Sequence, residues 1–139
     1  MGKFGFDLNL HDLTKEELAF CKQSIKDYNR LKSVILNGDQ YRLVSPYEGN
    51  HTSTMFVGKG GKKAVVFSFD IHPRYNEKLL NVKMQGLDPA KKYEVREINK
   101  FDCSVDDSKT FTGQYLMTVG LPIFTTKDLN SRIFEISSL

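Results

Sequence analysis

The spacing of hydrophobic and polar residues changes once along the chain, near Gly38. Residues 3–10 alternate between apolar and polar side chains, which predicts a strand with one buried face. The apolar residues of this strand are Phe4, Phe6, Leu8 and Leu10. Between residues 18 and 35 apolar residues recur at steps of three or four, which is the period of a helix with one apolar stripe. The chain is therefore predicted to open with one strand and one helix.

Both ends of the predicted helix carry recognisable signals. Thr14 and Glu17 have the spacing of a capping box, in which each residue satisfies a backbone N–H of the other. Leu13 and Leu18 can form a hydrophobic staple across the same turn. The pair at residues 37–38, Asn-Gly, is a typical helix stop.

Beyond Gly38 the period becomes two and turn residues recur at short intervals, which is typical of an all-β domain. The predicted strands are residues 40–45, 54–57, 64–71, 80–84, 93–98, 111–119 and 132–136. Glycines at 58–61 predict a hairpin, and the turn at 86–89 predicts a second one. In the strand at 64–71 we expect the core on the aromatic side, which carries Phe67 and Phe69.

The connections between the predicted strands are too short for the crossover helices that parallel strands need. The sequence therefore predicts an antiparallel, Greek-key-like β-sandwich that follows one N-terminal strand and one helix. A β/α unit joined to a sandwich is unusual within one domain. We therefore expect residues 1–38 to be the last β/α unit of a larger α/β domain and residues 39–139 to form the C-terminal β-sandwich domain.

Composition narrows the class of protein. The 139 residues suffice for one core, and 20 Lys plus Arg against 17 Asp plus Glu give a net charge of +3. The basic residues are spread along the chain, which argues against a nucleic-acid partner. No apolar run approaches a membrane span, and the first residues do not form a secretion signal, so the compartment is left open. Cys21 and Cys103 are expected to be buried free thiols.

Residues that could carry chemistry are present but do not form a known pattern. The histidines lack the spacing of a zinc site, and the acidic loop after residue 101 lacks the glycine and final glutamate of a calcium loop. We expect packing or surface roles for the histidines and a solvated loop for the acidic residues. The residues concerned are His11, His51 and His72, and Asp102, Asp106 and Asp107.

Several short motifs resemble, in order, the C-terminal part of family 36 glycoside hydrolases. Residues 2–10 (GKFGFDLNL) with 13–17 (LTKEE) are similar to the last strand and helix of the family's catalytic barrel. Residues 38–43 (GDQYRL) and 45–46 (SP), after Tyr28 and Leu31, look like the join to its C-terminal sandwich. The later matches are residues 64–67 (AVVF), 86–89 (GLDP) with Tyr93, 116–117 (LM) and 120–121 (GL).

The resemblance implies a parent enzyme that hydrolyses α-linked galactosides with retention of configuration, using two aspartates of earlier barrel strands. Those segments would precede Met1, so no catalytic, substrate-binding or metal residue and no cofactor is assigned to this chain. The implied role is a non-catalytic C-terminal domain of an α-galactosidase that stabilises the catalytic barrel, its expected partner. Asp7 would lie on the closing barrel strand, where a structural hydrogen bond is favoured over support of the sugar site because it lies mid-strand.

Two further expectations follow. An apolar strand without its barrel neighbours invites self-association through residues 3–10, or disorder of that segment. The sandwich could instead be a carbohydrate-binding module with tyrosines as a stacking platform, although core or edge positions explain the tyrosines better. The tyrosines considered are Tyr41, Tyr47, Tyr75, Tyr93 and Tyr115.

Overall fold

A computed structural model describes residues 5–100 and 107–139, and it places helix α1 (Lys15–Asn37) where the sequence predicts it. The capping box is confirmed, because the Thr14 hydroxyl accepts from the Glu17 N–H at 3.2 Å and the Glu17 carboxylate accepts from the Thr14 N–H at 2.8 Å. The hydrogen bonds that the Glu17 carboxylate accepts, first from the Thr14 N–H and then from the Thr14 hydroxyl at 2.9 Å, hold the pKa of Glu17 below its usual range. At the other end, a Cβ at Gly38 would lie 2.4 Å from the Val34 carbonyl oxygen, so glycine permits the close exit from the helix.

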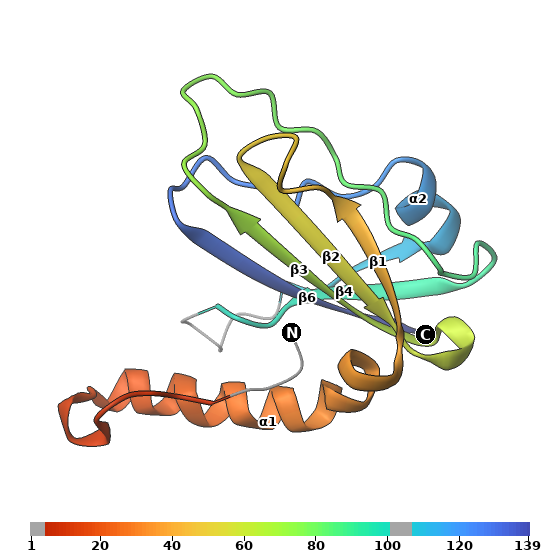
Figure 1. The fold of residues 1–139 in the computed structure, drawn as a ribbon. Coiled ribbons are helices and arrows are strands. Elements are labelled where there is room, and N and C mark those ends of the chain that lie inside the picture. Colours follow the sequence, from red (N-terminus) through yellow and green to blue (C-terminus); the bar gives the residue numbers. More distant parts are fainter. Residues whose placement is uncertain (1–4, 101–106) are drawn as a thin grey trace.

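The strands form one six-stranded sheet in the order β1-β2-β3-β6-β4-β5, and all neighbours are antiparallel (Figure 1). The strands are β1 (Asp39–Val44), β2 (His51–Val57), β3 (Lys63–Asp70), β4 (Lys92–Glu97), β5 (Lys109–Thr112) and β6 (Asn130–Ser138). The predicted hairpin across residues 58–61 is confirmed as β2 and β3, joined through the short 3-10 helix η2 (Lys59–Gly61). The mainly-β antiparallel class is thus confirmed.

Both faces of the sheet are covered, because β3 buries alternate residues on opposite sides. Val65 faces α1 and forms a small core with Leu31 and Phe56, whereas Val66 belongs to the larger core on the opposite face. The expectation that the core lies on the aromatic side of residues 64–71 was therefore wrong for the larger core. The residues of that larger core include Met55, Ala64, Met84, Tyr93, Leu116, Ile123 and Ile136, all at most 2% exposed.

The layer over the larger core is made of irregular segments and a short helix. Residues 80–87 and 121–124 cross this face together with α2 (Gly113–Thr118), on the opposite side of the sheet from α1 (Figure 1). All the described strands belong to one sheet, so the second layer of the predicted sandwich contains no further sheet among the described residues. Its segments are fastened by backbone bonds such as Val82 N–H to Leu121 O, at 2.9 Å.

Three local predictions were wrong. Within residues 3–10, positions 5–9 form no strand, and η1 (Leu10–Asp12) is a 3-10 helix; positions 3–4 lie outside the described residues. No described strand pairs with this segment, so its alternating pattern has no sheet to join. Residues 80–84 make only one bridge, Val82 with Leu121, and therefore form no hairpin with β4.

The third error concerns residues 111–119, where β5 ends at Thr112 and α2 begins. The Thr112 hydroxyl caps this helix by accepting from the Tyr115 N–H at 3.1 Å. A Cβ at Gly113 would lie 2.0 Å from the Asp88 carbonyl oxygen, so the chain passes the 86–89 turn too closely for any other residue. No described helix is long and apolar enough to cross a membrane.

Candidate functional site

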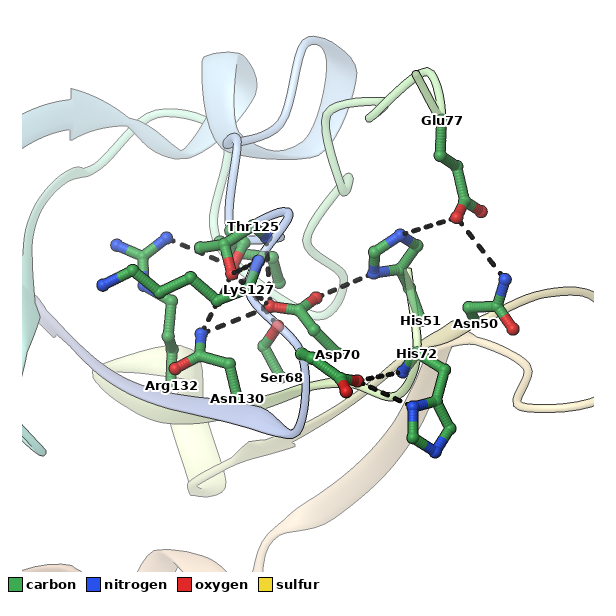
Figure 2. Close-up of polar contacts among 12 residues, drawn as sticks. Asn50, His51, Ser68, Asp70, His72, Glu77, Thr125, Lys127, Asn130 and Arg132 are labelled. Carbon is green, nitrogen blue, oxygen red and sulfur yellow. Dashed lines mark hydrogen bonds and ion pairs between the residues drawn. The ribbon is translucent and has the colours of Figure 1, made fainter. Parts of the chain in front are cut away.

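Polar side chains gather around Asp70, the last residue of β3, which is only 1% exposed (Figure 2). Its Oδ2 accepts hydrogen bonds from the backbone N–H of Thr125 at 3.0 Å, from the Thr125 hydroxyl at 2.8 Å and from the Asn130 amide at 3.3 Å. Its Oδ1 lies 2.7 Å from Nδ1 of His51. One buried carboxylate therefore connects β2, β3, β6 and the 121–129 segment.

His51 is the first residue of β2 and lies directly opposite Asp70 in the β2–β3 register. Because the Asp70 carboxylate accepts from all its other partners, Nδ1 is the ring nitrogen that donates to it. Nε2 is buried and has no hydrogen-bond partner among the described residues. The nearest charged group to Nε2 is the Glu77 carboxylate at 3.7 Å, and the ring packs on Phe124 with centroids 4.7 Å apart.

Glu77 belongs to the long loop after β3 and is held towards His51 by its neighbours (Figure 2). Its carboxylate accepts from the Arg74 N–H at 2.9 Å and from the Asn50 amide at 3.5 Å. The Arg74 N–H is the main cause that holds the pKa of Glu77 below its usual range, and the Asn50 bond and the charges of His51 and Arg74 act in the same direction. Glu77 thus presents an anionic acceptor beside the unpartnered Nε2.

A pocket of about 530 Å³ opens beside His51 and Glu77. Its walls come from the end of β1, the turn before β2, and the segment 77–85 that crosses the sheet. This polar pocket is lined by Leu43, Val44, Glu48, Gly49, His51, Glu77, Lys78, Leu79, Leu80, Asn81, Val82, Lys83, Gln85 and Phe124. Its volume is in the range of ~300–1,000 Å³ that is usual for small-molecule sites.

The opposite face of the sheet carries an ionic connection to α1. Arg30 pairs with Asp27 on its own helix at 2.6 Å and also with Glu135 of β6, and Arg96 of β4 pairs with the same Glu135 at 3.2 Å. Partial burial opposes the charge of Arg30, but the bonds to Asp27 and Glu135 raise its pKa above the usual value. This network fixes the helix over β6 as well as over β2 and β3.

Beside that network a groove of about 260 Å³ lies between α1 and the sheet, with an almost wholly apolar lining. Phe67, Ile98 and Ile133 line its sheet side and are only partly buried. The groove therefore exposes apolar surface that α1 does not cover. The apolar residues on its helix side are Phe20, Tyr28, Leu31 and Ile35, and Phe6 reaches it from the N-terminal segment.

The structure does not unite the residues considered from the sequence. Asp7 is exposed outside any strand, and His11 is exposed in η1. His72 is exposed and pairs with Asp128 at 2.9 Å. Cys21 is a buried free thiol as predicted, and Cys103, Asp102 and Asp106 lie outside the described residues. The bond from Lys100 lowers the pKa of Asp107, and the described residues contain no cluster of three His, Cys, Asp or Glu that could hold a metal ion.

The five tyrosines divide into two groups. Tyr93 is fully buried, and its hydroxyl donates to the Gly61 carbonyl and accepts from the Asp88 N–H, both at 2.9 Å. Tyr41 packs against the larger core, and Tyr115 stacks on Phe111, so core or edge positions are confirmed for these three. That explanation was wrong for Tyr47 and Tyr75, which are 96% and 95% exposed.

Comparison with known proteins gives the class of this fold. The family model described as "Glycosyl hydrolase family 36 C-terminal domain" matches residues 51–136. The chain belongs to this family, as the sequence motifs predicted.

The particular relatives are α-galactosidases of fungi and bacteria. Probable alpha-galactosidase C of Aspergillus terreus is 33% identical over 132 residues, which is 95% of this chain and 16% of that protein. Alpha-galactosidase AgaA of Geobacillus stearothermophilus is 27% identical over 139 residues, and its crystal structure superimposes with a TM-score of 0.80 over 98% of this chain and 18% of that one. The chain thus spans less than a fifth of the length of these relatives.

Proposed function

We propose that this chain is the non-catalytic C-terminal part of a retaining α-galactosidase, and that its task is to support the catalytic barrel. In this proposal residues 1–38 form the last β/α unit of the barrel and residues 39–139 form the attached β-domain. The relatives named above are α-galactosidases, and this chain matches only a small share of each. A supporting domain attached to a larger catalytic domain would show this pattern.

The observation that carries the proposal is the uncovered apolar groove between α1 and the sheet. Ile98, Ile133 and Phe67 remain partly exposed in this groove. They lie on the same face of the sheet as α1, which covers only part of that face. Further apolar side chains, Ile25 at 44% and Leu36 at 56% exposed, lie on α1 itself. Exposed apolar surface of this kind is typical of an interaction site, and a catalytic domain packed there would bury it.

The test uses the longer gene product that the proposal requires, together with a truncation after residue 38. The full product should hydrolyse p-nitrophenyl α-galactoside, whereas the truncated one should aggregate or unfold at a lower temperature because its apolar contact surface is exposed. The isolated 139-residue chain should show no turnover. Turnover by the pure 139-residue chain, or an unchanged melting temperature after truncation, would contradict the proposal.

A matched pair of variants locates the contact in the longer gene product. Ile98→Asp places a charge in the groove, whereas Leu129→Asp places one at an apolar residue that is 73% exposed and does not line the groove. Burying an unpaired charge is costly, so Ile98→Asp should lower the melting temperature of the longer product much more than it lowers that of the 139-residue chain. Leu129→Asp should lower the melting temperature of neither protein. Equal effects of Ile98→Asp on the longer product and on the 139-residue chain would place the contact elsewhere.

The isolated chain should also associate weakly with itself through residues 3–10. Phe6 and Leu8 are 40% and 54% exposed, so the described part of this segment presents apolar side chains to solvent. Sedimentation velocity should show dimers at high concentration that disappear when residues 1–10 are deleted. Dimers that persist after the deletion would assign the association to another surface.

A further inference from the structure

The polar pocket contains a buried hydrogen-bonding atom that the described chain does not satisfy. Nε2 of His51 has no partner there, although His51 is only 9% exposed. Nδ1 lies 2.7 Å from Asp70, so Nε2 is the ring nitrogen left to meet a ligand, and a hydroxyl group can serve it as either a donor or an acceptor. Buried polar atoms without a partner are rare and unfavourable in native proteins. The atom therefore favours a ligand that carries hydroxyl groups.

A carboxylate stands beside this nitrogen. Oε2 of Glu77 lies 3.7 Å from Nε2 and already accepts from the Arg74 N–H and the Asn50 amide. Figure 2 shows His51 between Asp70 and Glu77, with its ring aimed at the Glu77 carboxylate. Two hydroxyls on neighbouring carbon atoms can contact Nε2 and this carboxylate at once, because each hydroxyl both donates and accepts.

The charges around the pocket favour a neutral ligand. Glu48 and Glu77 line it together with Lys78 and Lys83, so the acidic and basic side chains balance. A phosphate would meet two carboxylates, and a polyamine would meet two ammonium groups. Asn81 and Gln85, which also line the pocket, each offer both a donor and an acceptor, as a ligand rich in hydroxyl groups requires.

Two exposed aromatic residues lie close along the chain to residues that line the pocket. Tyr47 precedes the lining residue Glu48, and Tyr75 lies two positions before the lining residue Glu77. Both rings are at least 95% exposed, and Phe124 contributes an apolar surface inside the pocket. Aromatic rings pack well against the apolar C–H face of a sugar ring while their polar edges remain in water.

We propose that the polar pocket is a binding site for a neutral saccharide, in which Nε2 of His51 and the Glu77 carboxylate form hydrogen bonds with neighbouring hydroxyls. Tyr47 and Tyr75 pack against the ring of the same ligand or of the next sugar unit. This activity goes beyond the support of a catalytic barrel and does not depend on it, since the pocket lies on the opposite side of the sheet from the apolar groove.

The test is a titration of the ¹⁵N-labelled 139-residue chain with D-galactose, raffinose, sorbitol and inorganic phosphate, followed by backbone and imidazole NMR shifts. Galactose or raffinose should cause saturable shifts at residues 47–51 and 75–85, and the Nε2 signal of His51 should move as this nitrogen gains a hydrogen-bond partner. Sorbitol, which lacks a rigid ring face, and phosphate should cause no saturable shift. The chain contains no tryptophan, so tyrosine fluorescence gives an independent readout of binding, and its comparison with Tyr75→Ala isolates the contribution of Tyr75.

Four variants separate binding from folding. Glu77→Gln should raise the dissociation constant by about tenfold or more, because a charged acceptor is replaced by a weaker neutral one. Tyr75→Ala removes a side chain that is 95% exposed and should weaken binding without altering the fold. His51→Gln should abolish the Nε2 response and weaken binding, whereas His72→Gln, an exposed histidine that does not line the pocket, should change nothing.

The saccharide site is rejected if neither sugar produces saturable shifts at its solubility limit. It is equally rejected if sorbitol or phosphate binds as tightly as the sugars, or if Tyr75→Ala and Glu77→Gln both leave the dissociation constant unchanged. None of these outcomes bears on the supporting role, which is tested through the groove on the other face.

Discussion

Replacing Asp70 with alanine should lower the free energy of unfolding by about 3–5 kcal/mol, because it removes a buried carboxylate that accepts four hydrogen bonds. The carboxylate is 1% exposed and accepts from His51, twice from Thr125 and from Asn130. Its loss leaves these donors buried without partners, and each unsatisfied group carries a desolvation cost. Since small domains are stable by only about 5–15 kcal/mol, the variant should unfold at a much lower urea concentration.

Asp128→Ala is the matched control for Asp70→Ala. Asp128 also pairs with a histidine, His72 at 2.9 Å, but both side chains of this pair are more than half exposed. Exposed ion pairs contribute little, so this variant should change the free energy of unfolding by less than about 1 kcal/mol. Urea titrations followed by circular dichroism compare the two variants. Similar midpoints would show that the Asp70 cluster does not stabilise the fold.

Leu31→Ala should lower the free energy of unfolding by about 2–5 kcal/mol, the usual range for a buried leucine cut to alanine. Leu31 is 2% exposed and packs with Val34, Phe56 and Val65 in the small core that joins α1 to the sheet. Because the larger core lies on the other face, the loss should act first on α1. Hydrogen exchange should therefore accelerate in α1 more than in β3 and β6.

Ile25→Ala provides the comparison on the same helix. Ile25 is 44% exposed, so its truncation should cost less than about 1 kcal/mol and leave the exchange of α1 nearly unchanged. If Leu31→Ala and Ile25→Ala had equal effects, the helix would be held by its ionic network with Glu135 and not by the small core. In that case Arg30→Ala should release α1 instead.

The β2–β3 hairpin shows how much of the site could be predicted from the sequence. The two strands and the glycines between them were recognised, and a regular antiparallel register then pairs His51 with Asp70 at the far end of the hairpin. The three histidines show no ligand spacing along the chain, so no local pattern reveals that His51 pairs with Asp70. Its third partner, Thr125, comes from an irregular segment 55 residues further along, which no local pattern places beside Asp70.

The wrong strand predictions have a common physical cause. Alternation with a period of two shows that one side of a segment is buried, but it does not show that a neighbouring strand pairs with it. Residues 80–84 alternate because Val82 and Met84 point into the larger core, while their backbone bonds run to Leu121 and Leu116 instead of a strand. Residues 5–9 alternate although no described strand pairs with them. Family resemblance, carried by motifs across the whole chain, was the more dependable guide to the class of protein.

The position of β6 determines the order in which the sheet can be completed during synthesis. This strand is the last of the six along the chain, yet it lies in the middle, between β3 and β4. Until the ribosome has released residues 130–138, β1-β2-β3 and β4-β5 are two separate ribbons, each with an open inner edge that can pair with another chain. The nascent protein should therefore depend most on chaperones in the short interval before its last strand emerges.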